Sequence, residues 1–438
     1  MKTFMITGPS SNTGKTSLSL GIARALKNRG LDISPFKTGP DFIDTKYLEI
    51  AAGKTAGNLD IHMMGIEGLK EAIAMNNGEY GIVEGAMGYF DGIHNTFENS
   101  SFHISEELDI PAILVYVPKG EMFSAIPKLK GIIDFSNHRI KGIIFNKTNK
   151  KIYDMLKEKV EEYLDIEVLG YVPQDESLEI GERYLGLLQV HENLDLDNKL
   201  DIISEKIEET VDIDRLLLLA RDIEIQPFKY PRKRDITVGI AYDEAFNFYY
   251  QENLKLLEKT AELVYFSPLN HRKLPDVDLI YIGGGYPELY RDRLSSNRDM
   301  IESIRDFAKN GGRIYSEGGG FMYLVEDIEG VPMCGLIKGK AVMTNRLQRF
   351  GYIDIKLKMD CLLGTKGDII KGQEFHRSIV ETGEREIFKI TKPKSNKNWE
   401  CGYMIYNTLA GYPHINFLGN KKVFNHILDI LEKSKRGE

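Results

Sequence analysis

The first half of the chain alternates between two patterns of hydrophobic and polar residues. Short runs rich in β-branched residues predict strands, whereas between Ser17 and Asn28 the apolar residues recur at near-helical spacing. Strands that alternate with helices are typical of βαβ units, so we predict an α/β fold with a mostly parallel sheet. The strands expected in this half are Thr3–Thr7, Ile33–Phe36, Gly81–Glu84, Ala112–Val117, Lys141–Asn146 and Val168–Val172.

A second α/β domain is predicted after a short linker. A helical stretch from about Leu200 to Arg221 precedes Ile225–Arg234, which holds two prolines and a basic cluster. A solvated turn explains Arg232–Arg234 better than a nucleic-acid patch does. The predicted domains are residues 1–225, a linker over 226–235, and residues 236–438. The elements expected after the linker are strands Ile236–Ala241, Glu262–Phe266 and Asp278–Ile282 and a helix at about Phe248–Thr260.

Composition narrows the classes of function. The 438 residues include 57 Lys and Arg against 65 Asp and Glu, and a net charge of −8 argues against nucleic acid as a main partner. No apolar run is long enough to span a bilayer, and the N-terminus enters a strand pattern at once, so we expect no signal peptide and no membrane partner. The three cysteines form neither a disulfide framework nor a metal motif, which favours a cytoplasmic protein.

A phosphate-binding loop is predicted at Gly8–Thr16, between the first strand and the first helix. Backbone N–H groups and the helix N-terminus cradle phosphates in such a loop. We expect Gly14 and Lys15 to bind the phosphates of ATP and Thr16 to hold Mg²⁺. A strict P-loop has glycine where Pro9 stands, with Gly8 one place earlier here.

Two carboxylates support a phosphoryl-transfer site. Asp41 follows the second strand and Glu84 ends the third, and the carboxyl ends of parallel strands line the ligand crevice of an open sheet. We therefore predict Asp41 and Glu84, with Thr16, as Mg²⁺ ligands. After the fifth strand, Asn146 is a candidate for reading the adenine edge, although a plain turn explains it equally well.

At these residues the chain resembles the cobyrinic acid a,c-diamide synthase family over nearly its whole length. The family's first domain is similar to dethiobiotin synthetase, and its second is similar to a class I glutaminase. Each matching stretch is short, but their order along the chain is specific. The stretches are Gly8–Thr16, Pro35–Asp44, Asn58–Asp60, Val83–Gly92, Glu182–Leu187, Asp243–Tyr250, Phe266–Leu269, Gly283–Leu289 and Gly372–His376.

The resemblance implies an ATP-dependent amidation of tetrapyrrole side-chain carboxylates, with cobyrinate as the expected substrate. ATP first phosphorylates the carboxylate, and ammonia then displaces phosphate to leave an amide. By the same analogy, Asp41 and Asp44 lie where the substrate carboxylate meets the γ-phosphate, and Lys37 joins the nucleotide-binding residues. One departure is Val115–Gly120, where the family usually has an aspartate after the apolar run.

The nucleophile of the glutaminase-like domain is absent. The family reads Glu-Cys-Gly-Gly at a sharp strand-to-helix turn, whereas this chain has Gly318 at the position of the cysteine. His414 stands where the base is expected, and oxyanion contacts are expected near Gly283–Tyr286. Without a thiol, a structural role for His414 is equally open. No flanking signal places Cys334, Cys361 or Cys401 on the turn, and Ser316 should point elsewhere.

Several alternatives stay open at this point. Either the synthetase uses free ammonia, or the cysteine was lost from a glutamine-dependent enzyme. The macrocycle is cobyrinate or, as the runner-up, nickel-sirohydrochlorin. In a different class, the chain is a non-catalytic P-loop switch, or a degenerate protein that only binds a tetrapyrrole.

Overall fold

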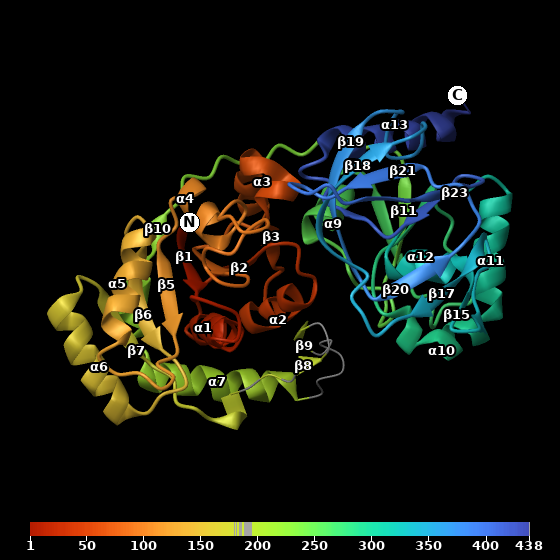
Figure 1. Cartoon of the computed structure of the whole chain (residues 1–438). Helices are drawn as coiled ribbons and strands as arrows, with labels where there is room; N and C mark the ends of the chain where they lie inside the picture. The colour runs from red at the N-terminus through yellow and green to blue at the C-terminus, as the bar shows by residue number, and fades with distance from the viewer. Residues whose placement is uncertain (179, 181, 184–185, 188–194, 438) are drawn as a thin grey trace. The chain divides into compact units, whose positions relative to one another are not determined.

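The computed structural model describes residues 1–178, 180, 182–183, 186–187 and 195–437. The chain divides into two compact units, one of Met1–Ile61 with Gly65–Phe228 and one of His62–Met64 with Lys229–Glu438. Figure 1 draws the first in red to green and the second in green to blue. Residues 223–236, at the change from one unit to the other, form no helix or strand.

The first unit is built on a parallel sheet in the order β3-β2-β4-β1-β5-β6-β7, with β10 antiparallel against β1. Strands β2 to β4 are added on one side of β1 and strands β5 to β7 on the other. The loops after β1 and β4 therefore lie at the carboxyl end of the sheet near this change of direction, where open α/β sheets bind ligands. Its strands are β1 (Lys2–Thr7), β2 (Ile33–Thr38), β3 (Gly57–Leu59), β4 (Tyr80–Glu84), β5 (Ala112–Tyr116), β6 (Ile140–Phe145), β7 (Glu167–Tyr171) and β10 (Arg221–Asp222). A short ribbon pairs β8 (Glu182–Arg183) with β9 (Gly186–Leu187).

Helices cover the first sheet and bury an apolar core against it. Gly21 allows α1 to approach α7 closely, because a Cβ at this position would lie 2.3 Å from the Ile207 side chain. Figure 1 shows α7 running beside α1. The helices are α1 (Lys15–Asn28), α2 (Ile43–Ala52), α3 (Ile61–Met75), α4 (Ser101–Glu107), α5 (Ala125–Phe135), α6 (Lys150–Tyr163), α7 (Leu196–Thr210) and α8 (Ile213–Leu219), with a 3₁₀ turn η1 (Glu176–Leu178).

The second unit has its own mostly parallel sheet, in the order β12-β11-β13-β14-β24-β23. Only β23 runs antiparallel to its neighbour. The strands are β11 (Thr237–Ala241), β12 (Glu262–Phe266), β13 (Leu279–Ile282), β14 (Arg313–Glu317), β23 (Tyr403–Ile405) and β24 (Thr408–Gly411). The helical elements of this unit are α9 (Gln251–Thr260), η3 (Pro287–Leu289), α10 (Arg291–Ser296), α11 (Arg298–Lys309), α12 (Gly319–Leu324) and α13 (Lys421–Arg436).

Two smaller sheets extend the second unit. One has the order β16-β15-β17-β20 and the other the order β22-β21-β18-β19-β25. The long strands β18 and β19 pair antiparallel along their length. The strands are β15 (Val325–Ile328), β16 (Val331–Pro332), β17 (Ile337–Met343), β18 (Arg349–Leu357), β19 (Ile369–His376), β20 (Ser378–Glu381), β21 (Phe388–Thr391), β22 (Asn398–Cys401) and β25 (His414–Ile415).

The α/β fold class predicted from the sequence is confirmed, and the predicted strands of the first unit differ from the observed ones by one or two residues at either end. The helical stretch expected from about Leu200 to Arg221 is divided into two helices, α7 and α8, and ends at Leu219. The chain leaves helix at Val211, and the Asp212 side chain then accepts the backbone N–H of Arg215 to begin α8. The helix expected from Phe248 begins only at Gln251, because Phe248 bridges to Gly284. The stretch Glu182–Leu187 lies partly outside the described residues.

Within the described part of the chain, no helix is both long enough and apolar enough to cross a membrane.

Candidate functional site

The loop Gly8–Thr16 joins β1 to α1 and is held in shape by close backbone contacts. Gly14 has φ +84°, and a Cβ there would lie 2.1 Å from the Asn146 amide nitrogen, so only glycine fits. Asn146 Nδ2 donates to the Thr13 carbonyl over 2.7 Å. The Asn146 amide thus fixes the loop, and its predicted role at the adenine edge stays a prediction.

Lys15 and Thr16 stand at the start of α1, as the loop requires. The Lys15 ammonium donates to the Ser10 carbonyl over 2.8 Å. Burial and the charge of Lys37 lower the pKa of Lys15 to about 8. The charged form of a lysine that is buried beside a second cation is destabilised, and the negative charge of a phosphate would stabilise it.

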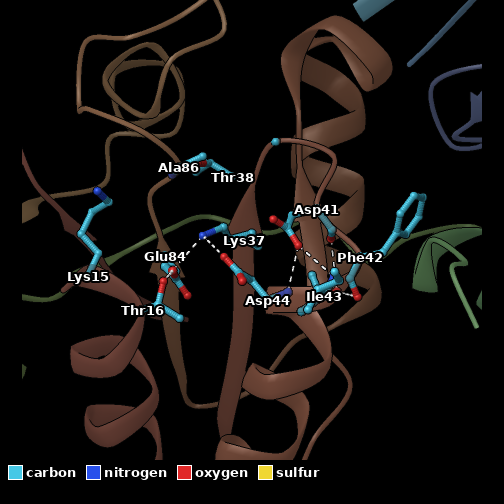
Figure 2. A network of polar contacts seen from close by, with 12 residues as sticks. Lys15, Thr16, Lys37, Thr38, Asp41, Phe42, Ile43, Asp44, Glu84 and Ala86 are labelled. Carbon is cyan, nitrogen blue, oxygen red and sulfur yellow. Dashed lines mark hydrogen bonds and ion pairs between the residues drawn. The ribbon is translucent and has the colours of Figure 1, made fainter. Parts of the chain in front are cut away.

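A chain of polar contacts links the ends of β2 and β4 to α1 (Figure 2). Glu84 Oε1 accepts from the Thr16 hydroxyl over 2.5 Å and from the Lys37 ammonium over 2.7 Å. Lys37 also pairs with Asp44 Oδ2 over 2.6 Å. Four side chains predicted from the sequence therefore meet at one end of the sheet.

The buried charges of this cluster shift each other's proton affinity. Burial alone would lower the pKa of Lys37, but the carboxylates of Asp44 and Glu84 outweigh it and hold this pKa above its ordinary value. Burial raises the pKa of Glu84 against the opposing charge of Lys37. Lys37 therefore stays a fixed cation between carboxylates.

Asp41 lies beside the cluster rather than within it. Its Oδ1 accepts the backbone N–H groups of Ile43 and Asp44, each over 2.8 Å, at the start of α2 (Figure 2). Asn58 on β3 donates to the carbonyls of Gly39 and Asp41 and so fixes this turn. Burial and the carboxylate of Asp44 raise the pKa of Asp41 to about 7. This carboxyl can exchange a proton near neutral pH.

The residues present fit a Mg²⁺ ion shared with phosphates. Glu84 Oε2 is buried and has no hydrogen-bond partner among the described residues, so one carboxylate oxygen is available next to the Thr16 hydroxyl. No cluster of three or more His, Cys, Asp or Glu that could hold a metal occurs in the described ranges. That is compatible with Mg²⁺, which binds through few protein ligands and takes the rest from phosphates and water.

A cavity of about 850 Å³ adjoins the outer side of the loop. Pro9–Thr13 form one wall, and Phe90, Tyr116 and Phe135 supply aromatic surface opposite, with Lys147 also among its lining residues. The loop thus borders a space large enough for a nucleoside.

A second candidate site lies in the second unit, at the turn from β14 to α12. Gly318 has φ 52° and ψ −114°, a conformation that residues with a side chain adopt only under strain. A Cβ at Gly318 would lie 2.7 Å from His414 Nε2. The backbone therefore aims residue 318 at the imidazole, although residue 318 has no side chain.

Glu317 holds the other side of the His414 ring. Its Oε2 lies 3.3 Å from His414 Nδ1 and accepts the Tyr281 hydroxyl over 2.9 Å. Its Oε1 accepts the Tyr315 hydroxyl over 2.6 Å and the Ile415 backbone N–H over 3.1 Å. Four donors fix this buried carboxylate, which in turn fixes the imidazole.

The turn Gly283–Tyr286 packs against the elbow, as the expected oxyanion contacts require. Gly320 N–H donates to the Gly283 carbonyl over 3.0 Å. A Cβ at Gly284 would lie 2.6 Å from His414 Cε1, so glycine is needed for this approach. Gly283 N–H donates to the Tyr249 hydroxyl over 2.8 Å.

The three thiols are poor replacements for the absent nucleophile. Burial raises the pKa of Cys334 and Cys401 to about 12 and that of Cys361 to about 11. Nucleophilic cysteines need the opposite shift. The Ser316 hydroxyl oxygen faces Gly320, where an added Cβ would lie 2.6 Å from it, and it is not among the atoms nearest to Gly318.

The structure brings together most of the predicted residues and adds others. Thr16, Lys37, Asp44 and Glu84 form one network, and Gly318 meets His414. Asp41 and Asn146 shape the backbone around the first site. Sequence reasoning assigned no role to Glu317, Tyr281 or Tyr315. The position of Glu317 directly before the nucleophile position is a sequence signal that could have identified it, whereas no sequence signal marks Tyr281 or Tyr315.

Comparison with known proteins identifies the domain that carries each candidate site. Residues 4–187 match the model of a CobQ/CobB/MinD/ParA nucleotide binding domain, and residues 237–422 match that of a CobB/CobQ-like glutamine amidotransferase domain. The chain is 41% identical over 436 residues to a cobyrinate a,c-diamide synthase of Clostridium acetobutylicum, covering 98% of this chain and 100% of that protein. It is 40% identical over 438 residues to the enzyme of the same description from Clostridium tetani, with 98% and 100% covered.

Proposed function

The chain belongs to the cobyrinate a,c-diamide synthase family, and on that premise we propose that it amidates the a- and c-side-chain carboxylates of cobyrinate at the expense of ATP. The observation that carries the proposal is the network of Thr16, Glu84, Lys37 and Asp44 at the mouth of the phosphate loop.

The first step is phosphoryl transfer. A carboxylate oxygen of the substrate attacks the γ-phosphorus of ATP, the bond to the β,γ-bridging oxygen breaks, and ADP leaves an acyl phosphate. Lys15 and Lys37 supply the positive charge that the transferring group needs. Asp44 and Glu84 hold Lys37 in place through the transfer.

Thr16 and Glu84 are the residues that would hold Mg²⁺. The bound ion would neutralise phosphate charge and help to orient the γ-phosphoryl group. Glu84 would use its unpartnered Oε2 for this, while Oε1 keeps its contacts to Thr16 and Lys37.

The second step forms the amide. Ammonia attacks the carbonyl carbon of the acyl phosphate, the C–O bond to phosphate breaks, and inorganic phosphate leaves. The nitrogen must also lose a proton. Asp41, with a pKa of about 7, is a suitable acceptor at the edge of the cluster.

We infer that free ammonia is the working nitrogen donor. Glutamine hydrolysis by this class of domain needs a thiolate that forms a covalent intermediate, and Gly318 has no side chain to supply it. The glutaminase activity of the second unit is therefore impaired, while glutamine is the ancestral donor.

Product mass spectrometry tests this proposal. Purified protein with ATP, Mg²⁺ and cobyrinate is given ammonium or glutamine, each labelled with ¹⁵N. We expect ADP and a diamide labelled from ammonium only. Equal labelling from glutamine would refute the ammonia inference, and neither ADP nor amide with either donor would refute the amidation itself. Turnover of nickel-sirohydrochlorin but not of cobyrinate would reassign the substrate.

A further inference from the structure

The second unit carries an exposed apolar surface that the glutaminase-like site does not use. It lies on residues 342–353 and 375–380, which belong to β17, β18, β19, β20 and the loop 344–348 and which we call the arm (Figure 1). Phe350 on β18 is directly opposite Phe375 on β19, and their ring centres are 5.1 Å apart. Val342 on β17 is opposite Ile379 on β20.

These side chains are unusually open to solvent. The exposed fractions are 54% for Phe350, 40% for Phe375, 38% for Val342 and 40% for Ile379, and Leu347 in the loop is 42% exposed. We call these five residues the apolar arm face. Single exposed apolar residues need no explanation, but two exposed cross-strand pairs on connected strands, with an exposed leucine in the loop that joins β17 to β18, indicate a binding surface.

The loop that joins β17 to β18 is held firmly against the opposite strand. Thr344 N–H donates to the Arg377 carbonyl over 3.1 Å, and Gln348 N–H donates to the His376 carbonyl over 2.9 Å. The Thr344 hydroxyl also donates to the Arg377 carbonyl, over 2.6 Å. The apolar arm face is thus displayed on fixed backbone rather than on a loose loop.

The middle of the arm is cationic in a chain of net charge −8. Residues 343–353 and 375–380 hold Arg346, Arg349 and Arg377, and the acidic residues Asp354, Glu374 and Glu381 stand directly beyond these ranges. Arg346 is exposed. The Arg349 guanidinium lies 4.7 Å from the ring centre of Trp399 on β22, and this contact restrains it.

We propose that the arm binds the tetrapyrrole substrate, with the apolar arm face packed against the macrocycle and Arg346 and Arg349 paired with its peripheral carboxylates. The ligand's identity rests on the proposed function. A macrocycle offers a broad apolar ring and a rim of carboxylates, which is the complement of this surface. Arginine binds carboxylates through two parallel hydrogen bonds, and aromatic side chains pack well on flat rings. The second unit would then serve substrate binding even without its nucleophile.

Fluorescence titration tests the arm without requiring turnover. Trp399 is the chain's single tryptophan and lies on the same sheet as β18, so its quenching by cobyrinate reports binding. We expect Arg346→Glu and Phe350→Asp each to raise the Kd for cobyrinate by about tenfold or more. The matched controls are Lys338→Glu, an equal charge change at the start of β17, and Ile369→Asp, which replaces an exposed residue at the far end of β19. Both controls should keep the wild-type Kd.

The outcomes separate this inference from the proposed function. All variants should keep the wild-type affinity for ATP, which shows that they fold. If the wild type binds cobyrinate and forms the amide, but the arm variants bind it equally well, the arm proposal fails alone. If binding depends on the arm and no amide forms with either nitrogen donor, the proposed function fails alone. A fall in molecular mass of the variants by sedimentation, with the Kd for cobyrinate unchanged, would instead make the arm an interface between copies and overturn the proposal.

Discussion

The candidate site at the phosphate loop and the candidate site at the Gly318 elbow differ in which of the expected side chains they contain. Beside the phosphate loop, the side chains of Thr16, Lys37, Asp44 and Glu84 are joined in one network of polar contacts. At the elbow, the base, its carboxylate and the strained backbone are in place, but the reacting atom is absent. The arrangement around residue 318 is therefore complete in its backbone and its neighbours, although residue 318 itself has no side chain.

Lys15 offers the strongest test of the complete site. Lys15→Met should lower ammonium-dependent ADP formation about a thousandfold, because the transferring phosphoryl group loses its nearest cation. Lys70→Met is the control, since Lys70 is exposed on α3 and pairs only with Glu67 among the described residues. Activity that survives Lys15→Met would show that the loop does not bind the reacting phosphates.

Gly318 offers the matching test of the incomplete site. Gly318→Cys should raise glutamine-dependent amide formation about a hundredfold over background, because the thiol emerges beside His414 Nε2. The positive φ will cost the variant about 1–3 kcal/mol of stability.

Gly318→Ala is the control for this gain, because it carries the same backbone strain without a thiol. It should leave glutamine unused, and adding His414→Ala to Gly318→Cys should abolish the gain. A wild-type chain that already uses glutamine as well as ammonium would contradict the prediction.

Glu317 precedes Gly318 at the elbow and contacts His414, so replacing Glu317 tests whether this contact matters for glutamine hydrolysis. In the Gly318→Cys background, Glu317→Gln should lower glutamine hydrolysis about thirtyfold, since the imidazole loses the carboxylate that orients it. The rate of alkylation of the introduced thiol should fall with it near neutral pH, while the three native thiols stay buried. An unchanged alkylation rate and unchanged hydrolysis would show that Glu317 serves the fold alone.

The pH dependence gives the smallest effect. If Asp41 must accept a proton, only its carboxylate form is active, and this form predominates only above the raised pKa of about 7. The kcat/KM for ammonia, calculated with the concentration of unprotonated NH₃, should therefore rise about tenfold from pH 6 to pH 8. Asp41→Asn can still accept the two N–H groups at the start of α2, and it should remove this dependence. A flat profile in the unaltered chain would exclude Asp41 as the acceptor.

The parallel core and the phosphate loop could be predicted from the sequence because their signals are local. β-branched runs mark β1, β5 and β6, and the Gly-Lys-Thr at Gly14–Thr16 follows a strand directly. The arm could not be predicted in this way, since β17 to β20 hold their places by pairing with distant strands rather than by strong periodicity.

The contacts inside the sites show the same limit. Asp41 and Asp44 are three residues apart, yet only Asp44 forms an ion pair with Lys37. Helix α2 begins between them, and the Asp41 carboxylate accepts the first backbone N–H groups of that helix instead. Tyr281 and Tyr315 bind Glu317 from neighbouring parallel strands, which no sequence motif relates. Three-dimensional register, rather than residue type, decides these contacts.

The left-handed elbow at Gly318 also has a genetic consequence. Two of the glycine codons differ from the cysteine codons only in their first base. The backbone at Gly318, with His414 and Glu317, already has the arrangement that a thiol would join. Where Gly318 is encoded by such a codon, a single base change would supply the thiol whose absence underlies our proposal of ammonia as the donor. Cells that carry this protein and must make the diamide on glutamine, with ammonium withheld, would select for that base change.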